Sequence, residues 1–285
     1  MKRGLESFTG LQVASLRLFI SFIFLSPIIV INFKKIKIHQ WKQLIFAGLI
    51  GSGFPAILFP LAQTKISSSI TGVLNTLVPL FTVIIGLLFF KMNLGKLKAI
   101  GALLGLVGAV GLLSVSGGIS FEHENFSYAL LIILATISYG TNVNYLKIYL
   151  KDIDAVNITA FGFLFMGPTA AIYLFSTDFI SILQTDEGAW KNLLYIGILA
   201  LFGTSIAVIL FNLLIKRSSA IFASSVTYVI PIFAIMWGVL DGETLESPQI
   251  IYTIIIILAV YIINKGNQVE EEYALEDVDK INSTK

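Results

Sequence analysis

Nine stretches of the chain contain no Asp, Glu, Lys or Arg: residues 18–33, 43–64, 66–90, 99–121, 125–146, 155–177, 192–215, 218–240 and 247–264. A helix rises about 1.5 Å per residue and must cross about 30 Å of hydrocarbon, so a span needs roughly 20 apolar residues. Eight stretches reach or nearly reach this length, and the first does if its helix begins near Leu11 and includes Arg17. The sequence therefore predicts an all-α integral membrane protein with nine transmembrane helices.

The composition agrees with a chain that lies mostly in lipid. Hydrophobic residues make up 56% of it and charged residues 13%, against about 45–50% and about 25% in average proteins. Cys is absent from the sequence, which excludes disulfide frameworks, cysteine zinc sites and thiol nucleophiles. The net charge of +2 gives no reason to expect a nucleic-acid partner. We expect the lipid bilayer as the surroundings, and neither a metal nor a cofactor.

The loops between these stretches separate into two sets by charge. One set carries eleven basic residues and two acids, whereas the other, with the N-terminal segment, carries four basic residues and nine acids. Short cytoplasmic loops retain Lys and Arg, so we expect the C-terminus in the cytoplasm and Met1 outside. The lack of Cys and the abundance of Ile, Asn and Lys suggest a bacterial inner membrane. The eleven basic residues are Lys34, Lys35, Lys37, Lys42, Lys91, Lys96, Lys98, Lys147, Lys151, Lys216 and Arg217.

The tail, residues 267–285, has a different composition from the rest of the chain. It carries six acidic residues and no long apolar run. Such a composition favours a solvated, disordered extension on the cytoplasmic side. A regulatory contact is the alternative interpretation.

Comparison of the chain with itself reveals a repeat at an offset of 152 residues. Residues 51–91 align without gaps with residues 203–243, and 10 of the 41 positions are identical. Matched Pro and Gly pairs are hard to attribute to apolar composition alone, because these residues restrict or free the backbone. The identical pairs are Gly51/Gly203, Ile57/Ile209, Leu58/Leu210, Phe59/Phe211, Leu61/Leu213, Ser67/Ser219, Pro79/Pro231, Phe81/Phe233, Gly86/Gly238 and Leu88/Leu240.

The two copies are expected to cross the membrane in opposite directions. By the loop charges, the stretch 66–90 runs from outside to inside, and its counterpart 218–240 runs from inside to outside. The second half holds five stretches and the first half four, so the missing member would precede Met1. Inverted repeats are typical of secondary transporters, which bind their solute between the repeats.

Three groups of residues together resemble the motifs of a known family. They are Ala223–Pro231 with Gly238 and Glu243; Gly72, Pro79 and Gly86 with Gly101 and Gly105; and Ala14-Ser15-Leu16-Arg17. On these residues, the chain resembles the EamA type of the drug/metabolite transporter superfamily. The resemblance implies two inverted five-helix repeats, with four of the five helices in residues 1–120 and all five in residues 121–266.

The sequence departs from the family pattern at two points. Lys91 stands where the first repeat usually has the acid matched by Glu243, so a role tied to that acid is not expected there. The family's first helix has no counterpart within residues 1–285. We expect that Met1 is a misassigned start and that upstream DNA encodes one more span.

Two prolines lie inside predicted helices at equivalent positions of the repeat. A helical Pro lacks the N–H donor and displaces the carbonyl four residues earlier. Pro79 therefore frees the carbonyl of Asn75, and Pro231 frees that of Thr227. Irregular backbone beside polar side chains is typical of a cavity for solute, and the alternative is a plain packing kink. We predict that Asn75 and Thr227 contact solute.

The stretch 125–146 is the most polar of the nine. Ser138, Asn142 and Tyr145 fall on one face of a helix. Polar side chains are unfavourable against lipid, so this face should point inward, either toward solute or into helix–helix hydrogen bonds. By the same argument, Asn212 and Tyr228 in the second half are candidates for contact with solute. The solute-binding residues predicted in this way are Ser138, Tyr139, Asn142, Asn212 and Tyr228.

Arg17 is the only charged residue well inside a predicted span. A charge at the bilayer centre costs roughly 2.5–3.5 kcal/mol. The side chain either reaches the outer membrane surface or provides a counter-charge for an anionic or zwitterionic solute. The spans contain no Asp or Glu, so the sequence gives no sign of ion coupling. Facilitated diffusion, exchange, and coupling through the edge acids Asp241 and Glu243 all remain open.

The favoured function is a carrier that exports small polar or amphipathic metabolites, such as amino-acid-like solutes, by alternating access of the two repeats. A membrane-embedded enzyme is disfavoured. Both histidines, His39 and His123, fall in predicted loops, and paired intramembrane aspartates and a histidine zinc motif are missing. A truncated, non-transporting remnant or scaffold is the third possibility. The sequence does not specify an oligomeric state.

Overall fold

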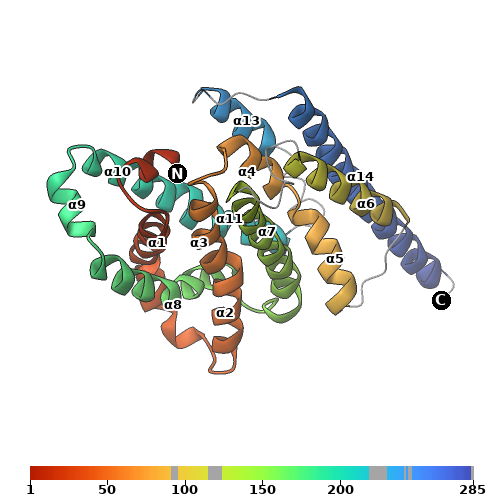
Figure 1. The fold of residues 1–285 in the computed structure, drawn as a ribbon. Helices are drawn as coiled ribbons and strands as arrows, with labels where there is room; N and C mark the ends of the chain where they lie inside the picture. The colour runs from red at the N-terminus through yellow and green to blue at the C-terminus, as the bar shows by residue number, and fades with distance from the viewer. Residues whose placement is uncertain (91–95, 115–123, 218–229, 241, 243–245, 284–285) are drawn as a thin grey trace.

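The computed structural model describes residues 1–285 except 91–95, 115–123, 218–229, 241, 243–245 and 284–285. Within the described residues, every regular element is helical (Figure 1). The elements are the 3-10 helices η1 (Lys2–Glu6) and η2 (Phe33–Lys35); the π-helices η3 (Leu49–Gly53) and η5 (Leu201–Ile206); and the α-helices α1 (Gly10–Asn32), α2 (Gln40–Gly48), α3 (Phe54–Ala62), α4 (Ser68–Asn75), α5 (Val78–Phe90), α6 (Lys96–Leu113), α7 (Glu124–Tyr149), α8 (Ala155–Ser176), α9 (Phe179–Thr185), α10 (Ala189–Ala200), α11 (Ala207–Arg217), α13 (Ile230–Leu240) and α14 (Ser247–Ser283).

Six helical segments of the described chain are long and apolar enough to cross a membrane, which agrees with an integral membrane protein. Two further apolar helical stretches, Leu103–Leu112 and Ser247–Ile263, are shorter. The expected spans 99–121 and 218–240 lie partly outside the described residues, so the total of nine stays a prediction. The six long segments are Gly10–Lys35, Gln40–Ala62, Ser68–Phe90, Phe126–Tyr149, Ala155–Ser176 and Ala189–Arg217.

The start of α1 is fixed by a capping box. Thr9 Oγ1 accepts a hydrogen bond from the Gln12 N–H at 3.3 Å, and Gln12 Oε1 accepts one from the Thr9 N–H at 2.9 Å. The Nε2 of Gln12 also donates to Asp178 Oδ1 at 2.8 Å and to Thr177 Oγ1 at 3.1 Å. The side chain that begins α1 therefore also ties it to the junction between α8 and α9.

Two of the spans contain a π-helix at the same position of the repeat. The segment η3 interrupts the span made of α2 and α3, and η5 interrupts the span made of α10 and α11. Their first residues, Leu49 and Leu201, differ by the same 152 positions as the sequence repeat. In η5, the hydroxyls of Thr204 and Ser205 donate to backbone carbonyls five residues earlier, at 3.3 and 2.9 Å. These bonds satisfy carbonyls that the wider turn displaces.

The helices pack in pairs around α7. Helix α1 lies along α8, and α6 lies along α14 at the opposite edge of the molecule (Figure 1). Helix α7 lies between these pairs and contacts α3, α4 and α5. The central position of α7 agrees with its many polar residues, because lipid does not surround it.

Glycines allow the closest helix crossings. A Cβ on Gly48 of α2 would lie 2.6 Å from the Gly162 carbonyl oxygen of α8, so neither backbone leaves room for a side chain. A Cβ on Gly101 of α6 would lie 2.8 Å from the carbonyl oxygen of Ala259 on α14. These contacts hold the α2–α8 and α6–α14 pairs at short range, as small residues do between membrane helices.

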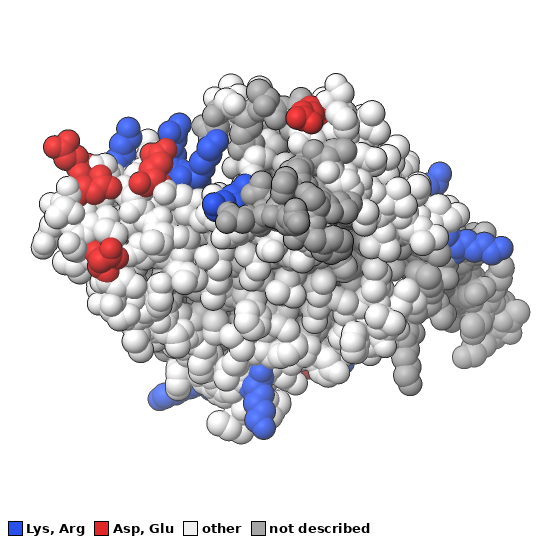
Figure 2. Space-filling model, viewed as in Figure 1, with Lys and Arg blue, Asp and Glu red and all other residues white. Residues whose placement is uncertain are grey.

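In the described part of the chain, exposed charged side chains gather toward the ends of the bundle. Figure 2 shows a broad, mostly uncharged zone between the end that carries the N-terminus and α9 and the opposite end. This pattern suits a protein with a belt of lipid around it. At the carboxyl end, α14 continues to Ser283, whereas the sequence predicts a disordered tail over 267–285. Glu, Ala and Leu in this segment have high helix propensity, which agrees with the longer helix.

Candidate functional site

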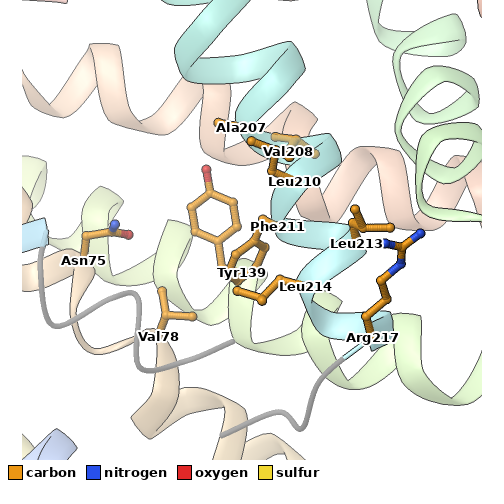
Figure 3. A pocket seen from close by; sticks show the side chains of 10 residues that line it. All are labelled: Asn75, Val78, Tyr139, Ala207, Val208, Leu210, Phe211, Leu213, Leu214 and Arg217. Atoms are coloured by element: carbon orange, nitrogen blue, oxygen red, sulfur yellow. The ribbon is translucent and has the colours of Figure 1, made fainter. Parts of the chain in front are cut away.

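A cavity of about 690 Å³ lies between α7, α11 and the junction of α4 with α5. Most of its lining is apolar and comes from α11, while Asn75 and Tyr139 supply polar groups from the other side (Figure 3). The cavity therefore combines residues from the first half of the chain with residues from the second. Its described lining consists of Asn75, Val78, Tyr139, Ala207, Val208, Leu210, Phe211, Leu213, Leu214 and Arg217.

Asn75 reaches this cavity because the helix is interrupted directly after it. Helix α4 ends at Asn75 and α5 begins at Val78, with Pro79 in its first turn. In the interruption, the N–H groups of Thr76 and Leu77 donate to carbonyls three residues earlier, at 3.0 and 3.1 Å. The lack of a donor on Pro79 explains why the helix does not continue. The Oδ1 of Asn75 is buried without a hydrogen-bond partner among the described residues.

Tyr139 and Asn142 lie one turn apart on α7. The Tyr139 ring packs against Phe59 of α3, with ring centroids 6.1 Å apart. Asn142 lies so close to Gly51 in η3 that a Cβ on this glycine would overlap the amide. Like Asn75, Asn142 has a buried Oδ1 without a hydrogen-bond partner in the described structure. Asn142 does not belong to the described lining of the cavity, whereas Asn75 does. Both amide oxygens are available to accept a hydrogen bond.

Arg17 is buried inside the bundle. Its side chain is only 9% exposed, and its Nε and Nη2 donate to Thr204 Oγ1 in η5 at 3.4 and 3.1 Å. The guanidinium also lies within electrostatic range of Tyr139. This placement differs from that of an arginine that extends along the bilayer to the membrane surface. It brings a positive charge close to a residue that lines the cavity.

Two other predicted residues are held by hydrogen bonds elsewhere. Ser138 Oγ donates to the carbonyl of Leu134 on its own helix at 3.0 Å. Asn212 Nδ2 donates to Thr159 Oγ1 of α8 at 3.0 Å, and Asn212 is buried. This second contact is the helix–helix hydrogen bond considered above as the alternative. Neither residue belongs to the described lining of the cavity.

The remaining predictions concern the second proline-containing helix. Thr227 and Tyr228 lie outside the described residues. Pro231 lies in the first turn of α13, as Pro79 lies in the first turn of α5. The two prolines therefore hold similar positions in their helices.

Sequence reasoning missed Thr204 and the apolar lining from α11. Thr204 is a common residue in an apolar stretch, so its type and position gave no signal. The sequence repeat did contain a signal, because Gly51 and Gly203 are matched in the alignment. Both glycines lie in π-helices. A widened helix turn at these matched glycines predicts displaced carbonyls, which the neighbouring hydroxyls of Thr204 and Ser205 can satisfy.

Comparison with known proteins gives the same assignment over nearly the whole chain. Residues 1–114 and 126–265 match the EamA-like transporter family. The Escherichia coli K12 protein named "Uncharacterized inner membrane transporter YedA" is 28% identical over 268 residues, which cover 92% of this chain and 84% of that protein. An Archaeoglobus fulgidus protein named "Uncharacterized transporter" is 23% identical over 267 residues, which cover 92% and 91% of the two chains.

A solved crystal structure has the same fold. It superposes with a TM-score of 0.61 at 16% sequence identity and covers 91% of this chain and 89% of its own. The fold, the apolar helices and the family match agree with one another. The chain belongs to the EamA-like transporter family and is a multi-pass membrane transporter.

Proposed function

We propose that the protein is a secondary transporter that exports small polar or amphipathic solutes by alternating access of two inverted repeats. The observation that carries this proposal is the cavity of about 690 Å³ lined by Asn75 from one half and by Tyr139 and α11 from the other. A cavity of this volume with a few convergent polar groups is typical of a small-molecule site. Export as the direction rests on the family resemblance.

The matched π-helices support two equivalent halves. The segments η3 and η5 begin 152 residues apart, which is the offset of the sequence repeat. A π turn is rare and occurs frequently at functional sites, so two of them at equivalent positions favour a shared origin and a shared role. In the orientation expected from the loop charges, the Lys-rich face and the C-terminus are cytoplasmic.

The polar groups around the cavity favour an amino-acid-like solute. The guanidinium of Arg17 can pair with a carboxylate, and the free amide oxygens of Asn75 and Asn142 can accept hydrogen bonds from an ammonium group. The apolar side chains of α11, among them Phe211 and Leu214, suit a hydrophobic side chain. A zwitterion with an apolar side chain would use all three kinds of contact.

The test is flux into proteoliposomes that contain the purified chain. Labelled apolar amino acids are compared with their decarboxylated amines and with the matching carboxylic acids, which each lack one charged group. We expect flux of the zwitterions and little of either analogue. Asn75→Ala and Asn142→Ala should each reduce flux by roughly tenfold, because each removes an interaction worth about 1–2 kcal/mol.

The matched control is Asn192→Ala. Asn192 also carries a buried amide, but it donates to Ser7 Oγ at 2.8 Å at the end of the bundle. This variant should retain flux. Undiminished flux in both cavity variants, with monodisperse protein, would reject the assigned site. Failure to move any zwitterion would leave the scaffold interpretation.

A further inference from the structure

A second cavity, of about 500 Å³, lies at the edge of the molecule where α1, α8, α9 and α10 meet (Figure 1). We call it the α1–α10 groove. A row of three aromatic rings lines it: Phe19 and Phe175 lie 5.8 Å apart, and Phe175 and Phe179 lie 6.0 Å apart. Among the described lining residues, only Trp190 carries a polar side-chain atom. None of them also lines the solute cavity, so the groove is a separate, almost wholly apolar space.

The sequence repeat identifies the equivalent place in the first half of the chain. The spans that contain η3 and η5 match at an offset of 152 residues, and this offset pairs Trp41 of α2 with Leu193 of α10. Helix α2 contacts α8, as α10 contacts α1. In the first half, the Trp41 indole packs edge-on against Phe161 and Phe165 of α8, with ring centroids 5.6 and 5.8 Å apart. An aromatic side chain therefore fills this place.

The second half has smaller side chains at the same positions. Helix α1 begins at residue 10 and α8 at residue 155, each after a side chain that caps it. This offset of 145 pairs Phe161 with Leu16 and Phe165 with Ile20, and both aliphatic residues line the groove. One turn beyond Leu193, a Cβ on Gly197 would meet no atom within 4 Å in the described structure. The groove is thus the space that three aromatic rings occupy in the other half.

We propose that the α1–α10 groove binds an acyl chain of a phospholipid whose headgroup carries a phosphate and an ammonium group, as in phosphatidylethanolamine. The groove opens toward the membrane, because Phe175, Trp190 and Leu194 in its lining are 55%, 64% and 62% exposed. An unfilled apolar void would lose the dispersion contacts of its lining, and hydrocarbon is the material at hand. A polar solute would find almost no hydrogen-bond partner there.

The charges beside the groove favour this headgroup. Lys191 follows Trp190 at the start of α10 and is exposed, and Asp186 and Glu187 directly precede this helix. Figure 2 shows acidic and basic side chains side by side at the end that carries the N-terminus and α9. The Lys191 ammonium suits a lipid phosphate, and the Glu187 carboxylate suits a lipid ammonium. A headgroup with only negative charge would meet the two acids without compensation. Tryptophan prefers the same membrane level as headgroups.

Photochemical labelling tests the proposal on the purified chain in detergent. The probe is phosphatidylethanolamine with a diazirine in the middle of one acyl chain, and mass spectrometry of the digested protein locates the label after irradiation. We expect the label to concentrate on the groove residues of α1, α8 and α10. Excess unlabelled phosphatidylethanolamine should remove it. Phosphatidylglycerol with the same acyl chains should compete about tenfold less well, since it lacks one charge-assisted hydrogen bond.

Filling the groove should exclude the lipid. Leu193→Trp introduces the indole that Trp41 supplies in the first half, and we expect at least about tenfold less label in the groove. The matched control is Ile198→Trp, which adds the same side chain to α10 at a 49% exposed position outside the described lining. It should retain the label. Thermal unfolding verifies folding, and if Leu193→Trp is less stable than the wild type, Gly197→Leu fills the groove from the next turn.

Three results would overturn the proposal. One is equal labelling of the groove in the folded filling variant and in Ile198→Trp. Another is a label spread evenly over the exposed apolar faces of the bundle, as unspecific contact with detergent-dissolved lipid would produce. Equal competition by phosphatidylglycerol would reject the headgroup assignment. Because labelling is measured without flux, a chain that transports nothing would reject the proposed function and leave this site unaffected.

Discussion

Arg17 shows how a single charge can be kept inside an apolar bundle. Its guanidinium donates twice to Thr204, and Thr204 Oγ1 in turn donates to the Leu199 carbonyl in its own span. The bond joins α1 of the first half to η5 of the second. Separating the two halves would leave Arg17 without its acceptor, and a buried charge without partners costs several kcal/mol. This hydrogen bond therefore favours the arrangement in which α1 contacts η5.

Removing the acceptor should destabilise the protein. Thr204→Val keeps the shape of the side chain but leaves Arg17 without this partner, so we expect a loss of about 1–3 kcal/mol. The measurement is thermal unfolding of the purified protein in detergent. Thr204→Ser keeps the hydroxyl and serves as the control. Equal unfolding temperatures for the two variants would show that the bond does not contribute to stability.

At the scale of elements, the sequence predicted some helices closely and missed what happens inside others. The charge-free stretches 125–146 and 155–177 correspond to α7 and α8 within a few residues. Pro79 predicted irregular backbone at Asn75, where α4 ends, but the sequence did not locate the π-helices. The length of a charge-free stretch indicates the length of the membrane span, but it does not reveal local changes in helix pitch. Those changes depend on packing partners such as Asn142, far away in the sequence.

Burial in the site was also hard to predict. The sequence left two interpretations of Arg17 open, because a partner 187 residues away cannot be read from local spacing. The predicted face of Ser138, Asn142 and Tyr145 likewise divides in the structure. Asn142 packs against Gly51 in η3, whereas Tyr145 packs on Phe46 with ring centroids 4.5 Å apart. Helix periodicity predicts which residues share one face of α7. The neighbour that each of these residues contacts depends on tertiary packing, which the local sequence does not reveal.

The crossing of α2 with α8 gives a prediction for elements. Gly48→Ala would place a methyl group 2.6 Å from the Gly162 carbonyl oxygen, so the helices must separate at a cost of about 1–3 kcal/mol. Gly197→Ala is the matched control, because a Cβ on this helical glycine has no neighbour within 4 Å in the described structure. It should be neutral or stabilise by up to about 1 kcal/mol. Thermal unfolding of both variants tests this, and a Gly48→Ala protein as stable as Gly197→Ala would contradict it.

At the scale of the whole molecule, the N-terminal segment is fastened to the second half. Ser7 Oγ accepts a hydrogen bond from Asn192 at 2.8 Å, and Gln12 binds Asp178 and Thr177. These contacts join residues more than 160 positions apart in the sequence. They hold the two halves together at the end where α9 and α10 meet.

Asp186 makes this fastening sensitive to acid. Hydrogen bonds from Ser7 and from the Gly188 N–H lower the pKa of the Asp186 carboxyl below its ordinary value. The stabilisation is therefore present above the unfolded-state pKa of about 3.9 and is lost as the pH falls through the lower folded value. The unfolding temperature of the wild-type protein should fall more between pH 7 and about pH 3 than that of Asp186→Ala. Parallel pH profiles of the two proteins would contradict this.

The membrane orientation can be tested with single cysteines. The loop charges predict that Lys65 faces the exterior and that Lys285 faces the cytoplasm. In right-side-out vesicles, an impermeant maleimide should label Lys65→Cys directly and Lys285→Cys only after permeabilisation. The reverse pattern would invert the proposed topology and the assignment of the Lys-rich face.

The two π-helices have a consequence for how the chain tolerates deletions. A π turn holds one residue more than the α turn it replaces, so each of these spans contains a surplus residue. Deleting Gly203 would remove this surplus residue and restore regular pitch, while later positions keep nearly their present direction. Phe211 and Leu214 would then still face the hollow that they now line. The same deletion in the regular part of α11 would instead rotate every later position by about 100° and displace the wall that this helix builds.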